Sequence, residues 1–147
     1  MARERGRTVI VSSVQSDSHT WNLVFLQLLI EELGYDVVNL GATVPDELLV
    51  CEALARKPEL IVISSVNGHG YQDGLRVVRK LRLHAGLRDT PVVIGGKLGI
   101  DGGESDQHIA NLLDAGFDAV FDDRPGTTAA FRRFAARLPE RAARGLA

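Results

Sequence analysis

Residues 8–34 read TVIVSSVQSDSHTWNLVFLQLLIEELG, and this stretch decides the fold. A run of β-branched residues, Thr8–Val14, is followed by a short polar segment and then by a helical pattern over about Trp21–Leu33. Leucine and isoleucine recur in that pattern at the spacing of a helix with one buried face, and Gly34 supplies a stop signal. The stretch therefore predicts a strand–loop–helix unit whose loop lies at the carboxyl end of the strand.

The same unit repeats along the chain. Four further apolar runs predict strands at Asp36–Leu40, Leu60–Ser65, Pro91–Gly95 and Asp118–Phe121. Four further helical patterns lie at about Asp46–Lys57, Gln72–His84, Ser105–Ala115 and Thr127–Leu138. Strands that are apolar throughout are typical of parallel sheets covered on both faces, and five β-α units predict a doubly wound α/β fold. We expect a flavodoxin-like (Rossmann-like) five-stranded sheet of order 2-1-3-4-5, in a single domain over residues 1–147 with its core at about 7–137 and frayed ends.

Bulk composition excludes several classes of protein. The 147 residues are 45% hydrophobic and 24% charged, which suits one domain with a real core. A net charge of −2 provides no basic surface for nucleic acid, and no apolar run reaches the length of a membrane span. The charged N-terminus lacks a signal-peptide pattern, and the single cysteine, Cys51, fits a reducing compartment. We expect a cytoplasmic protein without nucleic-acid or membrane partners, in which Cys51 is a small buried residue.

The topology predicts where a ligand binds. In doubly wound sheets the ligand lies beyond the carboxyl ends of the strands, at the switch point between the first and third strands. Residues 15–20, 64–70 and 95–99 should meet there. Small residues in these segments let a large flat ligand approach the backbone closely. In the first of these segments, His19 is a candidate metal ligand, and Asp17 is a candidate for the carboxylate that orients it.

Other chemistries fit these segments poorly. A response regulator needs an aspartate after the third strand, where Ser64 stands. A flavodoxin would place a phosphate at the start of the first helix, where Asp17 would repel it, and only Trp21 and Tyr71 are plausible partners for a flavin ring. Zinc requires clustered ligands, whereas the four histidines are dispersed. One of them, His84, is expected in the last turn of its helix, where positive charge is favoured.

Three motifs, in order, resemble the cobalamin-binding domain, and specifically the small subunit of glutamate mutase (methylaspartate mutase). They are Asp17-Ser18-His19 after the first strand, Ser64-Ser65-Val66 after the third and Gly95-Gly96 after the fourth. Residues 34–41 look like the second strand of that family, and residues 115–118 and 125–128 like its closing segment. The resemblance covers roughly residues 7 to 137, and three motifs at the correct strand ends make it a specific one.

The resemblance implies a cofactor and a site. In this family the cofactor is adenosylcobalamin, a cobalt corrinoid whose own base is displaced, so that the motif histidine, here His19, becomes the lower axial cobalt ligand. Asp17 would bond to the other ring nitrogen, Ser64 would meet the displaced base, and Gly95-Gly96 would form the wall of a slot for the nucleotide tail. The residues expected to contact the cofactor are Ser16, Asp17, Ser18, His19, Thr20, Ser64, Ser65, Val66, Gly68, Gly95, Gly96, Lys97, Leu98, Gly99, Ile100, Pro125, Gly126 and Thr127.

The resemblance also implies a division of labour. In this family a separate large barrel-type catalytic subunit holds the substrate, and the two subunits run a radical rearrangement of L-glutamate to 3-methylaspartate. This chain would then be one component of an isomerase, with no catalytic residue of its own. The alternatives are a corrinoid carrier, a regulatory cobalamin-binding protein, or a relative that no longer binds cobalamin. A carrier usually has a preceding helical bundle and a regulator a fused output domain, and neither is seen in this sequence.

Some residues depart from the family's motifs. Asn22 stands where the family has glycine, so a side chain occupies space beside the tail, although asparagine tolerates unusual backbone angles better than most residues. Val66 replaces leucine, a mild loss of volume. Trp21 is bulky beside the axial ligand. We interpret it as an anchor that packs the first helix, with contact to the corrin edge or to the partner subunit as the alternative.

Overall fold

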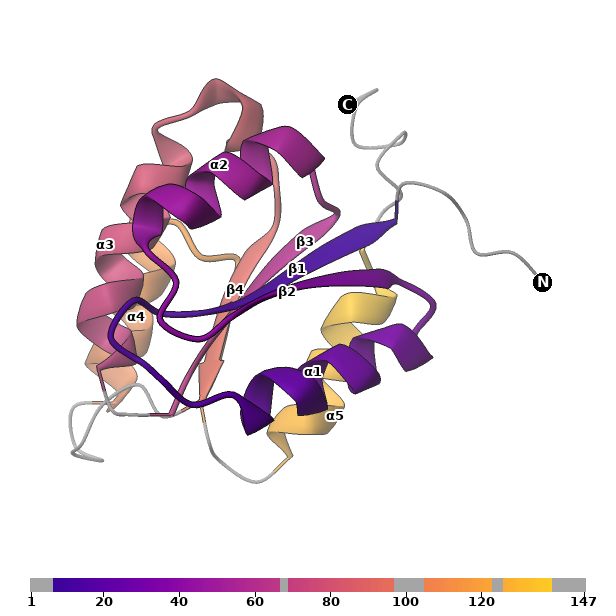
Figure 1. Ribbon diagram of the computed structural model, residues 1–147. Helices are drawn as coiled ribbons and strands as arrows, with labels where there is room; N and C mark the ends of the chain where they lie inside the picture. The colour runs from indigo at the N-terminus through magenta and orange to yellow at the C-terminus, as the bar shows by residue number, and fades with distance from the viewer. Residues whose placement is uncertain (1–6, 67–68, 97–104, 123–125, 139–147) are drawn as a thin grey trace.

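The computed structural model describes residues 7–66, 69–96, 105–122 and 126–138 and places them in a three-layer α/β fold (Figure 1). In chain order the elements are β1 (Thr8–Ser13), α1 (Trp21–Glu32), β2 (Asp36–Gly41), α2 (Asp46–Arg56), β3 (Leu60–Ser65), α3 (Gly70–Arg82), the short 3-10 helix η1 (Ala85–Leu87), β4 (Val92–Gly96), α4 (Ser105–Ala115), β5 (Ala119–Asp122) and α5 (Thr127–Ala136). The five strands are parallel, in the order β2-β1-β3-β4-β5. The predicted flavodoxin-like fold is confirmed.

Helices cover both faces of the sheet. α1 and α5 lie on one face, and α2, α3 and α4 lie on the other (Figure 1). Because alternate residues of a strand point to opposite faces, the core divides into two clusters. Val9, Val11 and Val62 pack with the side chains of α1 and α5, whereas Ile10 and Ile61 pack with those of α2, α3 and α4. Burial on both faces explains why the strands are apolar throughout.

The predicted helix and strand boundaries agree with the structure to within two residues. Shifts of two residues occur at the end of α5 and at both ends of α3, which begins at Gly70 and ends at Arg82. His84 therefore lies beyond α3, directly before η1, and the prediction that it occupies the last turn of that helix is wrong. The chain leaves the helix there because it must turn back through η1 toward β4.

Cys51 is exposed on α2, so the prediction that it is buried is also wrong. The buried apolar residues of α2 are Leu49 and Ala53, which lie one turn apart on the same side of the helix. Cys51 lies two residues from each, and at 3.6 residues per turn that spacing places it on the opposite side. The apolar character of cysteine did not reveal which side of the helix it occupies.

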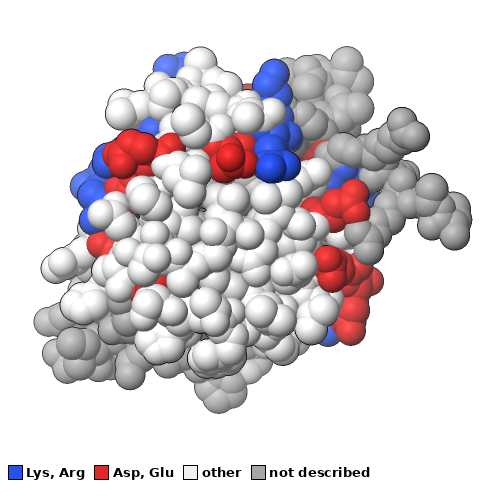
Figure 2. All heavy atoms as spheres, in the orientation of Figure 1, with Lys and Arg blue, Asp and Glu red and all other residues white. Residues whose placement is uncertain are grey.

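One surface of the molecule is largely uncharged (Figure 2). It carries α1, on which Trp21, Val24, Phe25 and Leu28 are between 51% and 67% exposed. These residues are spaced three or four apart, so they form a stripe on the outward side of the helix. Trp21 is the most exposed of the four at 67%, so our interpretation of it as an anchor for the helix is wrong. Within the described part of the chain, no helix is long and apolar enough to cross a membrane.

Arg82 links three segments of the chain at the amino-terminal edge of the sheet through hydrogen bonds. Its guanidinium group donates to the carbonyl oxygens of Leu87 at 2.7 Å and Gly116 at 2.8 Å. It also pairs with Asp118 at 3.0 Å, whose carboxylate accepts from the N–H of Val92 at 2.8 Å. A planar group with five N–H donors suits this set of acceptors. One side chain thus joins the end of α3, the approach to β4 and the turn before β5.

Replacing Arg82 tests how much these hydrogen bonds contribute to the stability of the fold. We expect Arg82→Ala to lower the free energy of unfolding by about 2–4 kcal/mol, because it leaves buried carbonyl groups and a carboxylate without their charged donor. Arg82→Lys should lower the free energy of unfolding by less than Arg82→Ala, but it should not reach the stability of the wild type. A lysine ammonium group cannot bond to all of the acceptors that the planar guanidinium group reaches. Urea unfolding followed by circular dichroism measures both. Arg79→Ala, at an exposed position of the same helix, is the matched control, and an equal loss in that variant would contradict the role of Arg82.

Candidate functional site

Asp17 is the centre of the site. It is fully buried in the loop between β1 and α1, at the carboxyl edge of the sheet. Its Oδ2 atom accepts a hydrogen bond from the backbone N–H of Val66, directly after β3, at 2.6 Å. Its main-chain carbonyl accepts from the N–H of Thr43, in the segment after β2, at 2.8 Å. This one residue therefore ties together the segments that follow three neighbouring strands.

The same carboxylate holds His19. Its Oδ1 atom lies 3.0 Å from the backbone nitrogen of His19 and 2.6 Å from the ring Nδ1. An ionised carboxylate only accepts hydrogen bonds, so Nδ1 carries the proton and Nε2 keeps its lone pair. The side chain of His19 is 47% exposed, and Nε2 is its nitrogen for binding a metal. Asp17 thus fixes the tautomer of the ring and makes Nε2 a stronger ligand.

The charge on Asp17 follows from its contacts. Burial by itself raises the pKa of this carboxyl group. The backbone N–H groups of His19 and Val66 and the imidazole of His19 favour the ionised form and outweigh burial, so the pKa lies below its ordinary value of 3.8. Asp17 is therefore a carboxylate at neutral pH, as the orientation of His19 requires.

His19 does not belong to a larger set of metal ligands within the described residues. No group of three or more His, Cys, Asp or Glu side chains in that part of the chain is placed to hold a metal ion. A lone imidazole with an orienting carboxylate suits a metal that brings most of its ligands with it. Within the described residues, the Asp17–His19 pair therefore offers one imidazole donor together with its orienting carboxylate.

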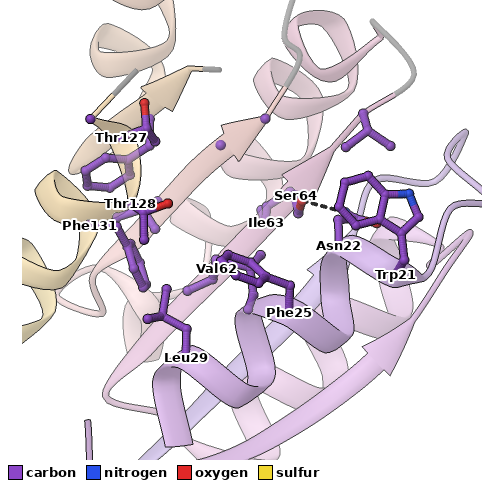
Figure 3. Close-up of a pocket in the computed structure, with 17 residues that line it drawn as sticks. Trp21, Asn22, Phe25, Leu29, Val62, Ile63, Ser64, Thr127, Thr128 and Phe131 are labelled. Atoms are coloured by element: carbon purple, nitrogen blue, oxygen red, sulfur yellow. Dashed lines mark hydrogen bonds between the residues drawn. The ribbon is translucent and has the colours of Figure 1, made fainter. Parts of the chain in front are cut away.

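A cavity of about 610 Å³, called the slot below, opens beside the Asp17–His19 pair. It lies between α1 and α5, over β3, β4 and β5 (Figure 3). The lining residues are Trp21, Asn22, Phe25, Leu26, Leu29, Val62, Ile63, Ser64, Val66, Val93, Gly95, Gly96, Phe121, Gly126, Thr127, Thr128 and Phe131. Most are apolar, and the polar ones lie toward the carboxyl edge of the sheet (Figure 3). Cavities of this size and character bind small organic molecules and cofactors.

The backbone itself forms part of the wall of the slot. At Gly96 the φ angle is +100°, and an added Cβ would overlap the carbonyl oxygen of Ser65. At Gly95 an added Cβ would lie 2.9 Å from the carbonyl oxygen of Phe121. Glycine is the residue that permits both the positive φ and the close approach of the neighbouring backbone. The glycine pair is therefore required by the packing at the ends of β3, β4 and β5.

Asn22 lies at the polar rim of the slot, where its side chain is turned toward β3 (Figure 3). The residue is 6% exposed, and its Nδ2 donates a hydrogen bond to Ser64 Oγ at 2.7 Å. Its Oδ1 atom is buried and has no hydrogen-bond partner among the residues that the structure describes. The side chain that replaces the motif glycine therefore adds an amide–hydroxyl pair to the rim.

A charged network lies behind the loop that carries His19. Ser16 donates to Asp73 of α3 at 2.5 Å, and Asp73 pairs with Arg76 at 2.8 Å. Arg76 also pairs with Asp46 of α2 at 2.6 Å, and Lys80 reaches the same carboxylate at 3.1 Å. Burial raises the pKa of Asp46, but the hydrogen bonds and charges of Arg76 and Lys80 outweigh it and lower that pKa overall. Ser16 thus anchors the loop to two helices on the far side of the sheet.

The structure brings most of the predicted site residues to one edge of the sheet. Ser18 and Thr20 are exposed in the loop that carries His19, and Gly126 and Thr127 line the slot from α5. Ser65 is fully buried and is not among the residues that line the slot. The predicted residues Gly68, Lys97, Leu98, Gly99, Ile100 and Pro125 lie outside the described residues.

Sequence reasoning missed the apolar half of the slot. Leu29 belongs to the helical stripe that predicts core packing, and Val62 to a buried strand, so neither was a candidate for binding. The alternation of β3 carries a usable signal, because Val62 and Ser64 lie two residues apart and share one face of the sheet. The N–H donors at Thr43 and Val66 carry no such signal, because almost every residue has a backbone N–H.

Comparisons with known proteins agree on a family. The sequence model of the B12 binding domain matches residues 7–132. The glutamate mutase sigma subunit of Fusobacterium nucleatum is 30% identical over 121 residues, which cover 82% of this chain and 87% of that protein. Glutamate mutase sigma subunit 1 of Haloarcula marismortui is 32% identical over 116 residues, which cover 79% of this chain and 76% of that protein.

A solved structure shares the fold. The monomethylamine corrinoid protein of Methanosarcina barkeri matches 92% of this chain with a TM-score of 0.70 and 21% identity. The chain spans 59% of the length of that protein, and at this identity the likeness shows the fold alone. The sequence matches to the sigma subunits, in contrast, extend over most of both proteins. This chain therefore belongs to the B12-binding domain family, and glutamate mutase sigma subunits are among its relatives there.

Proposed function

We propose that this chain is the cobalamin-binding subunit of an adenosylcobalamin-dependent carbon-skeleton mutase, and that the reaction is the rearrangement of L-glutamate to 3-methylaspartate. The observation that carries the proposal is the Asp17–His19 pair beside the slot. The relatives named glutamate mutase sigma subunit support the choice of reaction. A cytoplasmic location is part of the proposal, since the single cysteine is exposed and suits a reducing compartment.

The described residues fit a cobalt corrinoid. The corrin ring would bring most of the cobalt ligands with it, and His19 Nε2 would supply the ligand from the protein. The slot has room for the nucleotide tail, and Gly95 and Gly96, which line it, have no side chains. When bound, adenosylcobalamin supplies a cobalt–carbon bond whose cleavage starts radical chemistry.

In this proposal, Asp17 and His19 act as one unit. The carboxylate keeps the proton on Nδ1 and so directs the lone pair of Nε2 out of the loop. Because Asp17 also bonds to Val66, the segment after β3 is positioned together with the axial ligand. Ser64 would bind the base of the nucleotide tail, and the loop of residues 16–20 would hold the cofactor together with Gly126 and Thr127. The chain thus binds and orients the cofactor.

We assign the substrate to a large barrel-type catalytic subunit that forms a hetero-oligomer with this chain. The term sigma subunit in the names of the relatives supports a second component. A corrinoid carrier or a regulator is not favoured, because the relatives found by sequence are mutase subunits and the likeness to a corrinoid protein concerns the fold alone.

Replacing His19 tests the axial ligand. The protein mixed with hydroxocobalamin should show the absorption of a base-off, histidine-on corrinoid, and His19→Ala should lose that signature because the substitution removes Nε2. His84→Ala is the matched control, since His84 is exposed at the opposite edge of the sheet. Absorption spectra recorded during titration provide the measurement. An unchanged spectrum in His19→Ala would contradict the assignment of His19 as the cobalt ligand.

Replacing Asp17 tests the orienting carboxylate. Asp17→Asn should lower the free energy of unfolding by about 1–3 kcal/mol near pH 7, because two N–H groups lose a charged acceptor. It should also shrink the histidine-on fraction of bound corrinoid, since Nδ1 is no longer held as a donor. Unfolding in urea and the absorption spectrum are the two measurements.

The pH dependence of that loss has a defined sign. Because the folded pKa of Asp17 is lowered, the ionised form stabilises the fold above the ordinary value of 3.8, and this contribution falls away as the pH drops through the folded value. The difference in unfolding free energy between the wild type and Asp17→Asn should therefore shrink in acid. A difference that stays constant from about pH 7 to about pH 2 would contradict the proposed charge on Asp17.

Turnover should require a second protein. With adenosylcobalamin present, we expect this chain and the large subunit of a glutamate mutase to form 3-methylaspartate from L-glutamate together and neither to do so alone. Product formation followed by nuclear magnetic resonance is the measurement, and the His19→Ala chain with the same large subunit is the control. Activity of this chain by itself would overturn the proposed division of labour.

A further inference from the structure

The slot has two chemically different ends. Its rim, near the carboxyl edge of the sheet, carries the hydrogen-bonded side chains of Asn22 and Ser64 (Figure 3). Its lower end carries Leu29, Val62 and Phe131. Ser64 and Val62 lie two residues apart on one strand, which separates the ends by about 7 Å. A flat ring system can therefore reach from the rim to the lower end.

The three buried side chains of the lower end carry no hydrogen-bonding group, and the nearby hydroxyl group of Thr128 belongs to an exposed residue of the lining. Leu29, Val62 and Phe131 are each at most 5% exposed and belong to one apolar cluster. The backbone of β3 at Val62 is paired with β1 on one side and with β4 on the other. A polar group of a ligand that reaches this end gives up water and gains no partner, which weakens binding.

The rim offers hydrogen-bond donors. Asn22 Nδ2 donates to Ser64 Oγ at 2.7 Å, which leaves the hydroxyl proton of Ser64 for a ligand. The Oδ1 atom of Asn22 is buried and has no hydrogen-bond partner in the described part of the chain. The donor that the pair offers to a ligand is therefore the hydroxyl group of Ser64, which suits a ring nitrogen that accepts a hydrogen bond.

We propose that the slot selects the class of lower base that the corrinoid carries, and that it prefers a benzimidazole-type base to a purine. The inference rests on the proposed function, because it requires the nucleotide tail of a corrinoid to occupy the slot. Both classes of base have a ring nitrogen for the Asn22–Ser64 pair, so the rim does not separate them. The far ring of dimethylbenzimidazole carries two methyl groups, whereas that of adenine carries an amino group and ring nitrogens. The apolar lower end therefore makes the distinction.

Binding of three corrinoids to the full chain tests the proposal. The probes are hydroxocobalamin, the same corrinoid with adenine as its base, and cobinamide, which has no nucleotide tail. Absorbance titration provides a Kd for each, and the spectrum reports whether the histidine is bound. We expect the adenine form to bind about ten- to a hundredfold more weakly than hydroxocobalamin, as leaving a buried polar group without a partner predicts. Cobinamide should also bind more weakly.

The three probes separate the possible failures. Equal Kd values for the two bases would overturn the selectivity. If cobinamide binds as tightly as hydroxocobalamin and keeps the histidine-on spectrum, the slot does not hold the base, although the proposed function stands. If none of the three binds, both the selectivity and the proposed function fail.

A matched pair of variants assigns the selectivity to the lower end. Val62→Thr places a hydroxyl group in the slot at nearly constant volume, so the ratio of the two Kd values should fall several-fold. Val11→Thr is the control, because Val11 pairs with Val62 in the sheet and is buried in the same cluster but is not among the lining residues. It should leave the ratio unchanged. Equal Kd ratios in the Val62→Thr and Val11→Thr variants would overturn the assignment to the lower end. If Val62→Thr does not fold, Val93→Thr takes its place, because Val93 also lines the slot.

Discussion

The buried carboxylate of Asp17 is the constraint on which the rest of the site depends. Removing a charge from water is costly, and here the cost is offset by the N–H groups of His19 and Val66 and by the imidazole ring. Val66 is 49 positions away along the chain, so the carboxylate is satisfied only after β1 and β3 have paired. Pairing of β1 with β3 therefore completes the set of donors around the carboxylate that also bonds to His19.

The polarity of the slot follows from a single strand. β3 reads LIVISS, so apolar residues give way to serine as the strand approaches the carboxyl edge. Alternation along the strand places Val62 and Ser64 on the face that α1 and α5 cover, and this sets an apolar lower end below a polar rim. Gly96 completes the arrangement, because its positive φ lets the end of β4 lie against the carbonyl of Ser65 without a side chain between them.

Local patterns in the sequence were sufficient to predict the strands and the Asp17–His19 pair, because each depends on neighbours within a few residues. The sheet order joins strands that are distant in sequence, and it was predicted from the repeated β-α unit together with the general rules of parallel sheets. The Asn22–Ser64 pair joins positions 42 residues apart, and no local pattern indicates it. Trp21 was misplaced for a different reason. α1 is apolar on nearly all sides, so its periodicity does not show that Leu23 and Ile30 are buried whereas Trp21 is exposed and lines the slot. Only the packed structure distinguishes the two sides.

The electrostatics of the site argue for a binding role rather than an acid–base role. Asp17 is committed to His19 and Val66, Asp73 to Ser16 and Arg76, and Asp46 to Arg76 and Lys80. The pKa values of Asp17 and Asp46 are lowered by these contacts. A general acid or base works best with a pKa near the working pH, and carboxylates held ionised by charged partners are far from that condition. The contacts of Asp17 that hold His19 in place therefore also make this carboxylate unsuited to proton transfer at neutral pH.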